Sequence, residues 1–177
     1  MKLGLKQDEV KIVEYTPEWH EEFIRVKEEL VDHTGLDGKR IEHIGSTAIE
    51  GMSAKPILDL MVGVDDLRQV DKELLQAFQK AGFLRLKVER PGEIVLAKFT
   101  DDTYQEKTHF IHLVEYRKEL WGKLIFFRDY LNAEEVARKE YLAVKLAYLK
   151  NSATGINAYT DSKEAFVRDI VSKRFSS

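Results

Sequence analysis

The sequence predicts an α+β fold in which helices pack against a mixed or antiparallel sheet. One observation is that three strand-like segments, residues 83–88, 94–99 and 108–115, follow one another. No helical pattern separates them, whereas a doubly wound parallel sheet requires helices between its strands. A second observation is that apolar residues from Lys118 onward recur at helical spacing, so strands and helices are partly separated along the chain. Because no repeat or low-complexity linker occurs, we expect residues 1–177 to form a single domain.

The composition is that of an ordinary globular protein and excludes several kinds of site. Hydrophobic residues make up 44% and charged residues 33%, and the net charge of −3 does not indicate a binder of nucleic acid or of membrane surfaces. The chain has no cysteine, which excludes disulfides and thiolate metal sites. No apolar run approaches the roughly 20 residues of a membrane span, and the N-terminal segment MKLGLKQDEV lacks the apolar core of a signal peptide. We therefore expect a soluble, cytoplasmic protein.

The first part of the chain predicts a short strand followed by a helix. Residues 10–15 are typical of a strand. Thr16 is a suitable N-cap for the helix and Pro17 suits its first position, while Gly35 is expected to end it. The residues predicted to share its buried face are Trp19, Phe23, Val26 and Leu30.

The middle of the chain predicts two buried strands, a helix and a hairpin. The buried strands span residues 41–46 and 55–64, and Asp65 with Asp66 is expected to cap the helix that ends at Gly82. Pro91-Gly92 predicts the turn between the strands at residues 83–88 and 94–99.

The rest of the chain predicts three helices. One spans residues 119–131, and Asn132 with Glu135 resembles a capping box for the next, residues 134–150. Residues 151–157 are expected to form a loop. The last helix is expected at residues 162–175, capped by Asp161 with Glu164.

The chemistry centres on Asp59, a lone carboxylate in the apolar strand KPILDLMVGV. Burying an ionised carboxylate is costly unless it is paired, hydrogen-bonded or bound to a metal. Alternation places Asp59 and Met61 on one face of the strand and an apolar row on the other, which should pack on helices. If His112 faces the same side, it can reach Asp59. The alternative is a structural ion pair of Asp59 with Lys55, Arg128 or Lys163.

Several blocks of the chain together resemble the GrpB-like family. These blocks are GST, KPILDLMV, THFIHLV, FRDYL and YTDSK, and the resemblance extends from about Val10 to Phe175. The family is grouped by fold with the nucleotidyltransferase superfamily, so the resemblance implies a nucleotidyltransferase-like sheet. The superfamily pattern is a Gly-Ser at a strand end, then an Asp-x-Asp strand and a third carboxylate on a later strand, which hold Mg²⁺ for nucleotidyl transfer.

The sequence departs from that pattern at two positions. Met61 stands where the second carboxylate belongs, and His112 is the candidate for the third. A thioether is a poor ligand for Mg²⁺, so Asp59 with His112, His43 and His109 is the alternative set for a divalent metal such as Mn²⁺ or Zn²⁺. A histidine could instead act as a general base. Each histidine taken alone also fits an ordinary half-buried strand residue.

The expected ligand is a small-molecule nucleotide or another phosphorylated compound. Ser46 and Thr47 after Gly45 suit a phosphate contact, although they could simply cap the following segment. The cations expected to balance the ligand's charge are Lys55, Arg128 and Lys163, with Lys145 as a further polar residue on a mostly apolar helix. Surface salt bridges are the alternative for these cations.

Three functions remain open at this point. In a nucleotidyltransferase-like protein, Asp59 and His112 would be the catalytic residues. The rivals are a ligand-binding or regulatory protein without catalysis, which Met61 favours, and a metal-dependent hydrolase that uses the cluster of Asp59 and histidines.

Overall fold

A computed structural model describes residues 1–150 and 155–175, with only the backbone described for residues 155–162. The strands are β1 Leu5–Lys6, β2 Ile41–Ile44, β3 Leu58–Val64, β4 Leu84–Arg90, β5 Glu93–Phe99 and β6 Glu106–Glu115. The helices are α1 Glu18–Thr34, α2 Lys72–Lys80, α3 Glu119–Ala133, α4 Glu135–Lys150 and α5 Gly155–Ser172. In this described part, no helix combines the length and the apolar character needed to cross a membrane.

The strands form one mixed sheet in the order β2-β3-β6-β5-β4, with β1 paired to the start of β6. The neighbours β3 and β6 run parallel, and every other pair along this order is antiparallel. The mixed sheet packed with helices is the predicted α+β arrangement. Pro91-Gly92 joins β4 and β5 as predicted, and Gly92 has a φ of 76°, which favours glycine.

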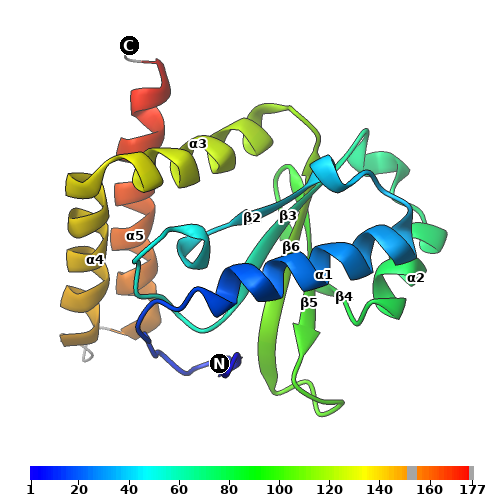
Figure 1. Ribbon diagram of the computed structural model, residues 1–177, viewed down its shortest axis with the longest axis horizontal. Helices are drawn as coiled ribbons and strands as arrows, with labels where there is room; N and C mark the ends of the chain where they lie inside the picture. Colours follow the sequence, from blue (N-terminus) through cyan, green and yellow to red (C-terminus); the bar gives the residue numbers. More distant parts are fainter. Residues whose placement is uncertain (151–154, 176–177) are drawn as a thin grey trace.

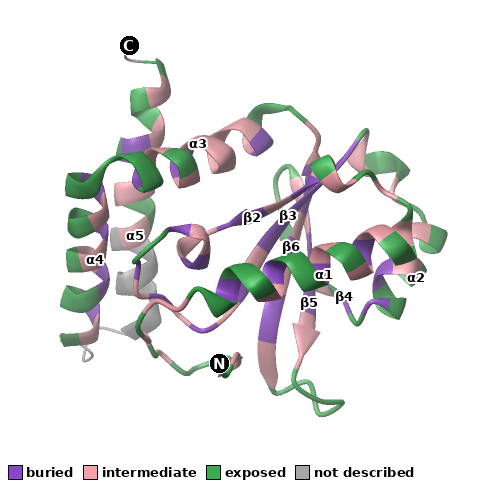
Figure 2. Cartoon of the chain, viewed as in Figure 1, coloured by how far each residue is buried: buried purple, intermediate pink, exposed green. Residues whose placement is uncertain are grey.

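Helices α1 and α2 cover one face of the sheet and enclose the main core (Figure 1). The predicted stripe on α1 is buried, whereas the outer side of this helix is exposed (Figure 2). It packs on the apolar row of β3 and on the matching residues of β6, as the alternation predicted. The members of this core from the two strands are Leu58, Leu60, Val62, Val64, Ile111 and Leu113.

Helix α3 covers one end of the opposite face, and α4 and α5 pack beside it (Figure 1). Trp121 of α3 packs with Met61, Ile44 and Val114 of the sheet. The three C-terminal helices share a second apolar cluster with the segment after β2, to which Ile49 and Met52 belong. The other end of this face is left for the cavity described below.

Two boundaries near the N-terminus differ from the prediction. Residues 10–15 form no strand, because Val13 makes only an isolated bridge to Ala54 and the sheet pairs the earlier residues Leu5 and Lys6 instead. Pro17 is the N-cap residue of α1 rather than its first helical residue. Thr16 still caps locally, since its hydroxyl accepts a hydrogen bond from the Glu18 N–H at 3.3 Å.

The predicted cap of α2 is also displaced. Asp66 caps a short 3₁₀ turn at Leu67–Gln69, and Asp71 is the N-cap of α2, accepting a hydrogen bond from the Leu74 N–H. Both aspartates accept hydrogen bonds from backbone N–H groups in the same way, so the residue types alone did not show which of them caps α2.

The predicted caps of the last two helices are wrong. Asn132 lies in the last turn of α3, and its side chain donates to Ala48 O and accepts from Glu50 N, which ties α3 to the segment after β2. Helix α5 begins at Gly155, so residues 155–157 are helical and Asp161 and Glu164 lie inside the helix instead of capping it. Residues 151–154 of the predicted loop lie outside the described residues.

Candidate functional site

A cavity of about 850 Å³ opens on the sheet face that α3 leaves uncovered. Its walls come from the N-terminal segment, the end of β2, the strands β3 to β6, and the helices α3 to α5. Seven basic side chains and three carboxylates are among the lining residues. The basic ones are Lys6, Lys55, Lys87, Arg90, Lys107, Lys145 and Lys163, and the acidic ones are Glu9, Asp59 and Glu93. The described wall of the cavity therefore carries an excess of positive charge.

The Gly45-Ser46 turn at the end of β2 forms part of this wall. Gly45 has a φ of 73°, and a Cβ atom at this position would lie 2.8 Å from Asp59 Oδ2. Both the conformation and the space therefore require glycine. Ser46 follows as the first residue of a 3₁₀ turn, with its side chain at the cavity. The sequence prediction that a Gly-Ser bend lies beside Asp59 is confirmed by this geometry.

Asp59 and His112 meet on the cavity side of neighbouring parallel strands, as predicted. His112 Nε2 lies 3.2 Å from Asp59 Oδ1, and His112 Nδ1 lies 3.1 Å from Glu93 Oε1 of β5. The exposed fractions of these side chains are 32% for Asp59, 17% for His112 and 10% for Glu93. Asp59 is thus held in an ion pair and still faces the cavity.

The two carboxylates keep His112 in its cationic form. Burial alone would lower the pKa of His112, but the hydrogen bonds and charges of Asp59 and Glu93 outweigh it and raise this pKa to about 9. Burial would raise the pKa values of Asp59 and Glu93, yet His112 holds both below their usual range. An imidazolium donates from both ring nitrogens, so one carboxylate accepts from each.

The arrangement does not fit the divalent metal that the superfamily pattern implies. Both His112 nitrogens face carboxylates and, when protonated, offer no lone pair to a metal. Met61 is fully buried beneath Trp121 and supplies no oxygen ligand. Among the described residues, no group of three or more His, Asp or Glu side chains is arranged so that it could hold a metal ion. The imidazolium of His112 lies between the carboxylates of Asp59 and Glu93.

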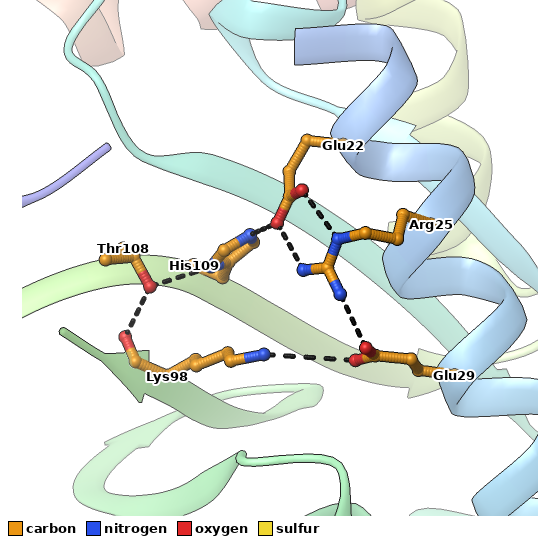
Figure 3. A network of polar contacts seen from close by, with 6 residues as sticks. All are labelled: Glu22, Arg25, Glu29, Lys98, Thr108 and His109. Atoms are coloured by element: carbon orange, nitrogen blue, oxygen red, sulfur yellow. Dashed lines mark hydrogen bonds and ion pairs between the residues drawn. The ribbon is translucent and has the colours of Figure 1, made fainter. Parts of the chain in front are cut away.

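His43 and His109, predicted as supporting metal ligands, lie on the other face of the sheet. His43 is buried, stacks on Phe23 and shares a 2.8 Å hydrogen bond with Thr47 Oγ1. His109 Nε2 contacts Glu22 of α1 at 2.9 Å (Figure 3). Burial lowers the pKa of each of these histidines to about 4, so both are neutral at pH 7. The structure therefore splits the four predicted metal ligands between two faces.

Lys145 of α4 reaches the Gly-Ser turn from the opposite wall. Its side chain is buried, and its Nζ donates to Ser46 Oγ at 2.6 Å and to Ser53 O at 3.2 Å. Burial and, to a smaller extent, the charges of Lys163 and Lys55 together lower the pKa of Lys145 to about 7. The amine therefore changes its protonation state near neutral pH.

The remaining predicted ligand residues fall into two groups. Ser46, Lys55 and Lys163 line the cavity, as expected for a shared site. Thr47 also touches it, but its hydroxyl is engaged with His43. Arg128 lies outside the cavity lining.

Arg128 has a structural set of partners instead. It donates to Glu42 at 2.8 Å, to the His43 carbonyl at 3.0 Å and to Asp129 at 2.9 Å. These contacts tie α3 to β2. The predicted contact of Arg128 with the ligand is therefore not supported by its position.

Glu93 is absent from the predicted site residues, and Lys145 is named only as a further polar residue beside the expected cations. Glu93 follows the Pro91-Gly92 turn, and the hairpin register places it on the same face as Val95, which pairs with His112. Lys145 lies four residues after Tyr141 and three before Tyr148, all on the buried side of α4. The helical spacing of Lys145 from these two buried tyrosines could therefore have predicted from the sequence that this lysine is buried.

Relatives of known sequence match nearly the whole chain. The sequence profile of the GrpB protein family matches residues 9–173. The glutamate-rich protein GrpB of Alkalihalophilus pseudofirmus is 38% identical over 172 residues, which cover 97% of this chain and 99% of that protein. A dephospho-CoA kinase of Mycolicibacterium paratuberculosis is 29% identical and covers 90% of this chain, which matches 44% of the kinase.

Solved structures agree with the same assignment. The crystal structure of the conserved protein GrpB from Enterococcus faecalis has a TM-score of 0.77 and 26% identity, with 92% of this chain and 96% of that chain covered. The Cid1 poly(U) polymerase with Mg 3′-dATP bound has a TM-score of 0.52 and 17% identity, with 76% and 42% covered, and this likeness concerns the fold alone. The chain therefore has a nucleotidyltransferase-like fold and belongs to the GrpB protein family.

Proposed function

We propose that the protein binds a nucleotide or a similar small phosphorylated molecule in this cavity, without the metal-dependent transfer chemistry of the superfamily. The observation that carries the proposal is the excess of basic over acidic side chains around one cavity on the sheet. Such an excess attracts anions, and lysines are common partners of phosphate.

The carboxylates of Asp59 and Glu93 offset only a small part of this charge. Asp59 and Glu93 share His112, so the three side chains together carry about one negative charge when the histidine is protonated. Lys55, Lys145 and Lys163 lie on the cavity wall beside them. A ligand with negative charge would therefore gain from binding at this wall, while a cationic ligand would not.

The Gly-Ser turn suits a phosphate for a second reason. Gly45 carries no side chain, which lets a ligand approach the backbone, and Ser46 offers a hydroxyl at the cavity. The amine of Lys145 lies 2.6 Å from that hydroxyl. A phosphate oxygen beside this pair, on the cavity side, could accept a hydrogen bond from each group.

The choice of test compounds follows from the fold and from one relative. Adenine and uridine nucleotides represent the compounds expected for a nucleotidyltransferase-like cleft. Dephospho-CoA is added because a dephospho-CoA kinase includes a segment related to this chain. The panel thus comprises ATP, ADP, UTP and dephospho-CoA, each with and without Mg²⁺.

Thermal unfolding tests the proposal, because a ligand that binds only the native state raises the melting temperature. We expect at least one compound to raise it without Mg²⁺, and Ser46→Ala and Lys55→Met to reduce the shift. Lys139→Met is the matched control, since Lys139 lies on α4 with a side chain 75% exposed. Absence of any shift from every compound at millimolar concentration would refute the proposal.

Nucleotidyl transfer is the second candidate, and one observation favours it. Asp59 retains an exposed carboxylate edge toward the cavity despite its ion pair with His112. Release of pyrophosphate from ATP, with the AMP group bound to an acceptor other than water, that stops in a folded Asp59→Asn variant would establish a transferase. If wild-type and variant protein both release none, the binding function stands alone.

A further inference from the structure

Lys145 is a buried amine whose described partners include no carboxylate. The side chain is 2% exposed, and it lies over the Tyr141 ring with Nζ 4.3 Å from the ring centroid. Its two hydrogen-bond acceptors, Ser46 Oγ and Ser53 O, are both uncharged. In the described part of the chain, no ion pair joins Lys145 to Asp or Glu. A buried ammonium ion in such surroundings is poorly stabilised.

Among the described residues, the charges that act on the amine of Lys145 are positive. Lys55, which precedes β3, and Lys163 of α5 both act on it by repulsion. Tyr141 on the same helix contributes its ring, and Ser46 on the turn after β2 contributes its hydroxyl. The three lysines all line the cavity. The local field therefore favours loss of the proton from Lys145 in the free protein.

We propose that Lys145 takes up a proton from solvent when a di- or triphosphate group binds beside Ser46, so that ligand binding and protonation of Lys145 are coupled. The inference rests on the proposed function and adds to it the part of the ligand that this wall recognises. A multiply charged phosphate group would give Lys145 the anionic partner that its described contacts lack. A neutral sugar or a free base would leave the amine without one.

The direction of the coupling follows from linkage. An anion within about 4–6 Å of a lysine raises its pKa, by about 1–3 units. In the free protein the pKa of Lys145 is about 7, so the amine is already protonated at pH 6 and binding takes up no proton there. Above pH 7 each binding event takes up as much as one proton. The affinity then falls up to tenfold per pH unit until the raised pKa is passed.

Titration calorimetry with two probes tests the coupling. Dephospho-CoA carries a diphosphate diester, and sulfate is a compact phosphate analogue. The charge that each offers to the lysines stays constant between pH 6 and pH 9. Binding is measured across this range in two buffers of different ionisation enthalpy, which gives the number of protons taken up. For wild-type protein we expect proton uptake at pH 8, none at pH 6, and weaker binding as the pH rises.

Two variants assign the proton to Lys145. Lys145→Met should bind the probes at least tenfold more weakly at pH 7 and take up no proton. Lys145→Arg carries a permanent charge, so binding should depend much less on pH between pH 7 and pH 8, where His112 keeps its proton. Lys139→Met, on the exposed side of α4, should behave as wild type. Circular dichroism of each variant checks that it is folded, and the arginine variant decides the matter if the methionine variant is not.

The outcomes separate this inference from the proposed function. Binding of a probe with no proton uptake at pH 8, or with uptake unchanged in both Lys145 variants, overturns the inference and leaves the proposed function intact. If neither probe binds wild-type protein but ATP or ADP does, the inference is again overturned alone. If no phosphorylated compound binds, both fail together.

Discussion

His109 and His112 lie three residues apart on β6 and face opposite sides of the same sheet. Their pKa values are shifted in opposite directions. Both contact carboxylates. His112 on the cavity face has its pKa raised to about 9, whereas His109 under α1 has its pKa lowered to about 4. The odd spacing along the strand alone places them in these two environments.

The opposite pKa shifts arise because the carboxylates differ in how many other cations they already contact. Glu22, the partner of His109, also accepts two hydrogen bonds from Arg25, and Lys98 lies close by (Figure 3). Asp59 and Glu93 have His112 as their shared cationic partner, with Arg90 adding a longer contact to Glu93. Burial therefore dominates on one face and charge on the other.

The neutral state of His109 also fixes its tautomer. Glu22 has a lowered pKa and is ionised, so His109 Nε2 must carry the proton that it donates. Nδ1 is then unprotonated and accepts from the Thr108 hydroxyl at 2.7 Å (Figure 3). This arrangement leaves no free position for a metal or a substrate and reads as structural support for α1.

The largest expected effect is that of His112→Gln on stability at low pH. A pKa raised from 6.5 to about 9 contributes stability that is full below pH 6.5 and is lost as the pH rises through 9. The substitution should lower the unfolding free energy by roughly 3 kcal/mol at pH 6 and by much less at pH 9.5. Urea unfolding at the two pH values measures this.

The control for this prediction is His33→Gln, an exposed histidine in the last turn of α1. It should change stability little at either pH. An equal loss at pH 6 and pH 9.5 for His112→Gln would contradict the view that His112 is cationic, and would reduce the two histidines to the same structural role.

Lys145→Met should stabilise the protein, which is the next largest effect. The pKa of Lys145 is lowered from 10.5 to about 7, so the folded state opposes a charge that the unfolded chain keeps. This cost is full below pH 7 and disappears as the pH rises toward 10.5. After the lost hydrogen bonds are allowed for, we expect a gain of about 2 kcal/mol at pH 7 that shrinks by pH 10.

Chemical unfolding at pH 7 and pH 10 checks this second prediction. The Lys145→Met protein also gives a sharper test of the first prediction, which concerns His112. In the wild type, the stability that Lys145 gains above pH 7 offsets the stability that His112 loses over the same range. The net fall in unfolding free energy between pH 7 and pH 9 should therefore be steeper in the Lys145→Met protein than in the wild type. A destabilised Lys145→Met variant at pH 7 would show that the amine is well accommodated.

On the other face, His109→Gln should remove part of the acid sensitivity. A histidine pKa lowered from 6.5 to about 4 costs stability as the pH falls through this range, because the unfolded chain binds the proton first. Between pH 8 and pH 5 the wild type should lose about 2 kcal/mol from this residue. The glutamine variant should lose less over the same interval in urea unfolding. A steeper acid loss in the variant would contradict a neutral His109.

Much of the fold could be predicted because its signals are local. Alternation in KPILDLMVGV placed Asp59 on the face opposite the apolar row, and the Pro91-Gly92 turn gave the hairpin. That His112 faces the same side was left open by the sequence and is decided by the register between β3 and β6. The pairing of Asp59 with Glu93 through His112 could not be predicted in this way, since it depends on the register between β5 and β6. Tertiary contacts also decided against a strand at residues 10–15, where the sheet pairs with earlier residues.

The cations could be predicted only in part. Lys55 and Lys163 line the cavity as expected, whereas Arg128 does not, because its acidic partners lie on β2 and on its own helix. A sequence block shows that a cation is present but not which carboxylate lies nearest. Burial of Lys145 likewise depends on how α4 packs against the segment after β2.

The smallest expected effect is that of Gly45→Ala, which tests whether the turn and the Asp59–His112 pair are one unit. The residue has a φ of 73°, and its new Cβ would lie 2.8 Å from Asp59 Oδ2, so the carboxylate must move. We expect a loss of about 1 kcal/mol in unfolding free energy from the strained backbone. We also expect the pKa of His112 to fall, since its partner is displaced.

Nuclear magnetic resonance titration of the two imidazoles separates a local effect from a global one. In the Gly45→Ala protein the His112 signal should titrate at lower pH than in the wild type, while His109 on the opposite face should stay neutral down to the same pH. Equal shifts in both would mean that the substitution disturbs the whole sheet. An unchanged His112 would mean that Asp59 has room to move aside and that the glycine is required for its backbone conformation alone.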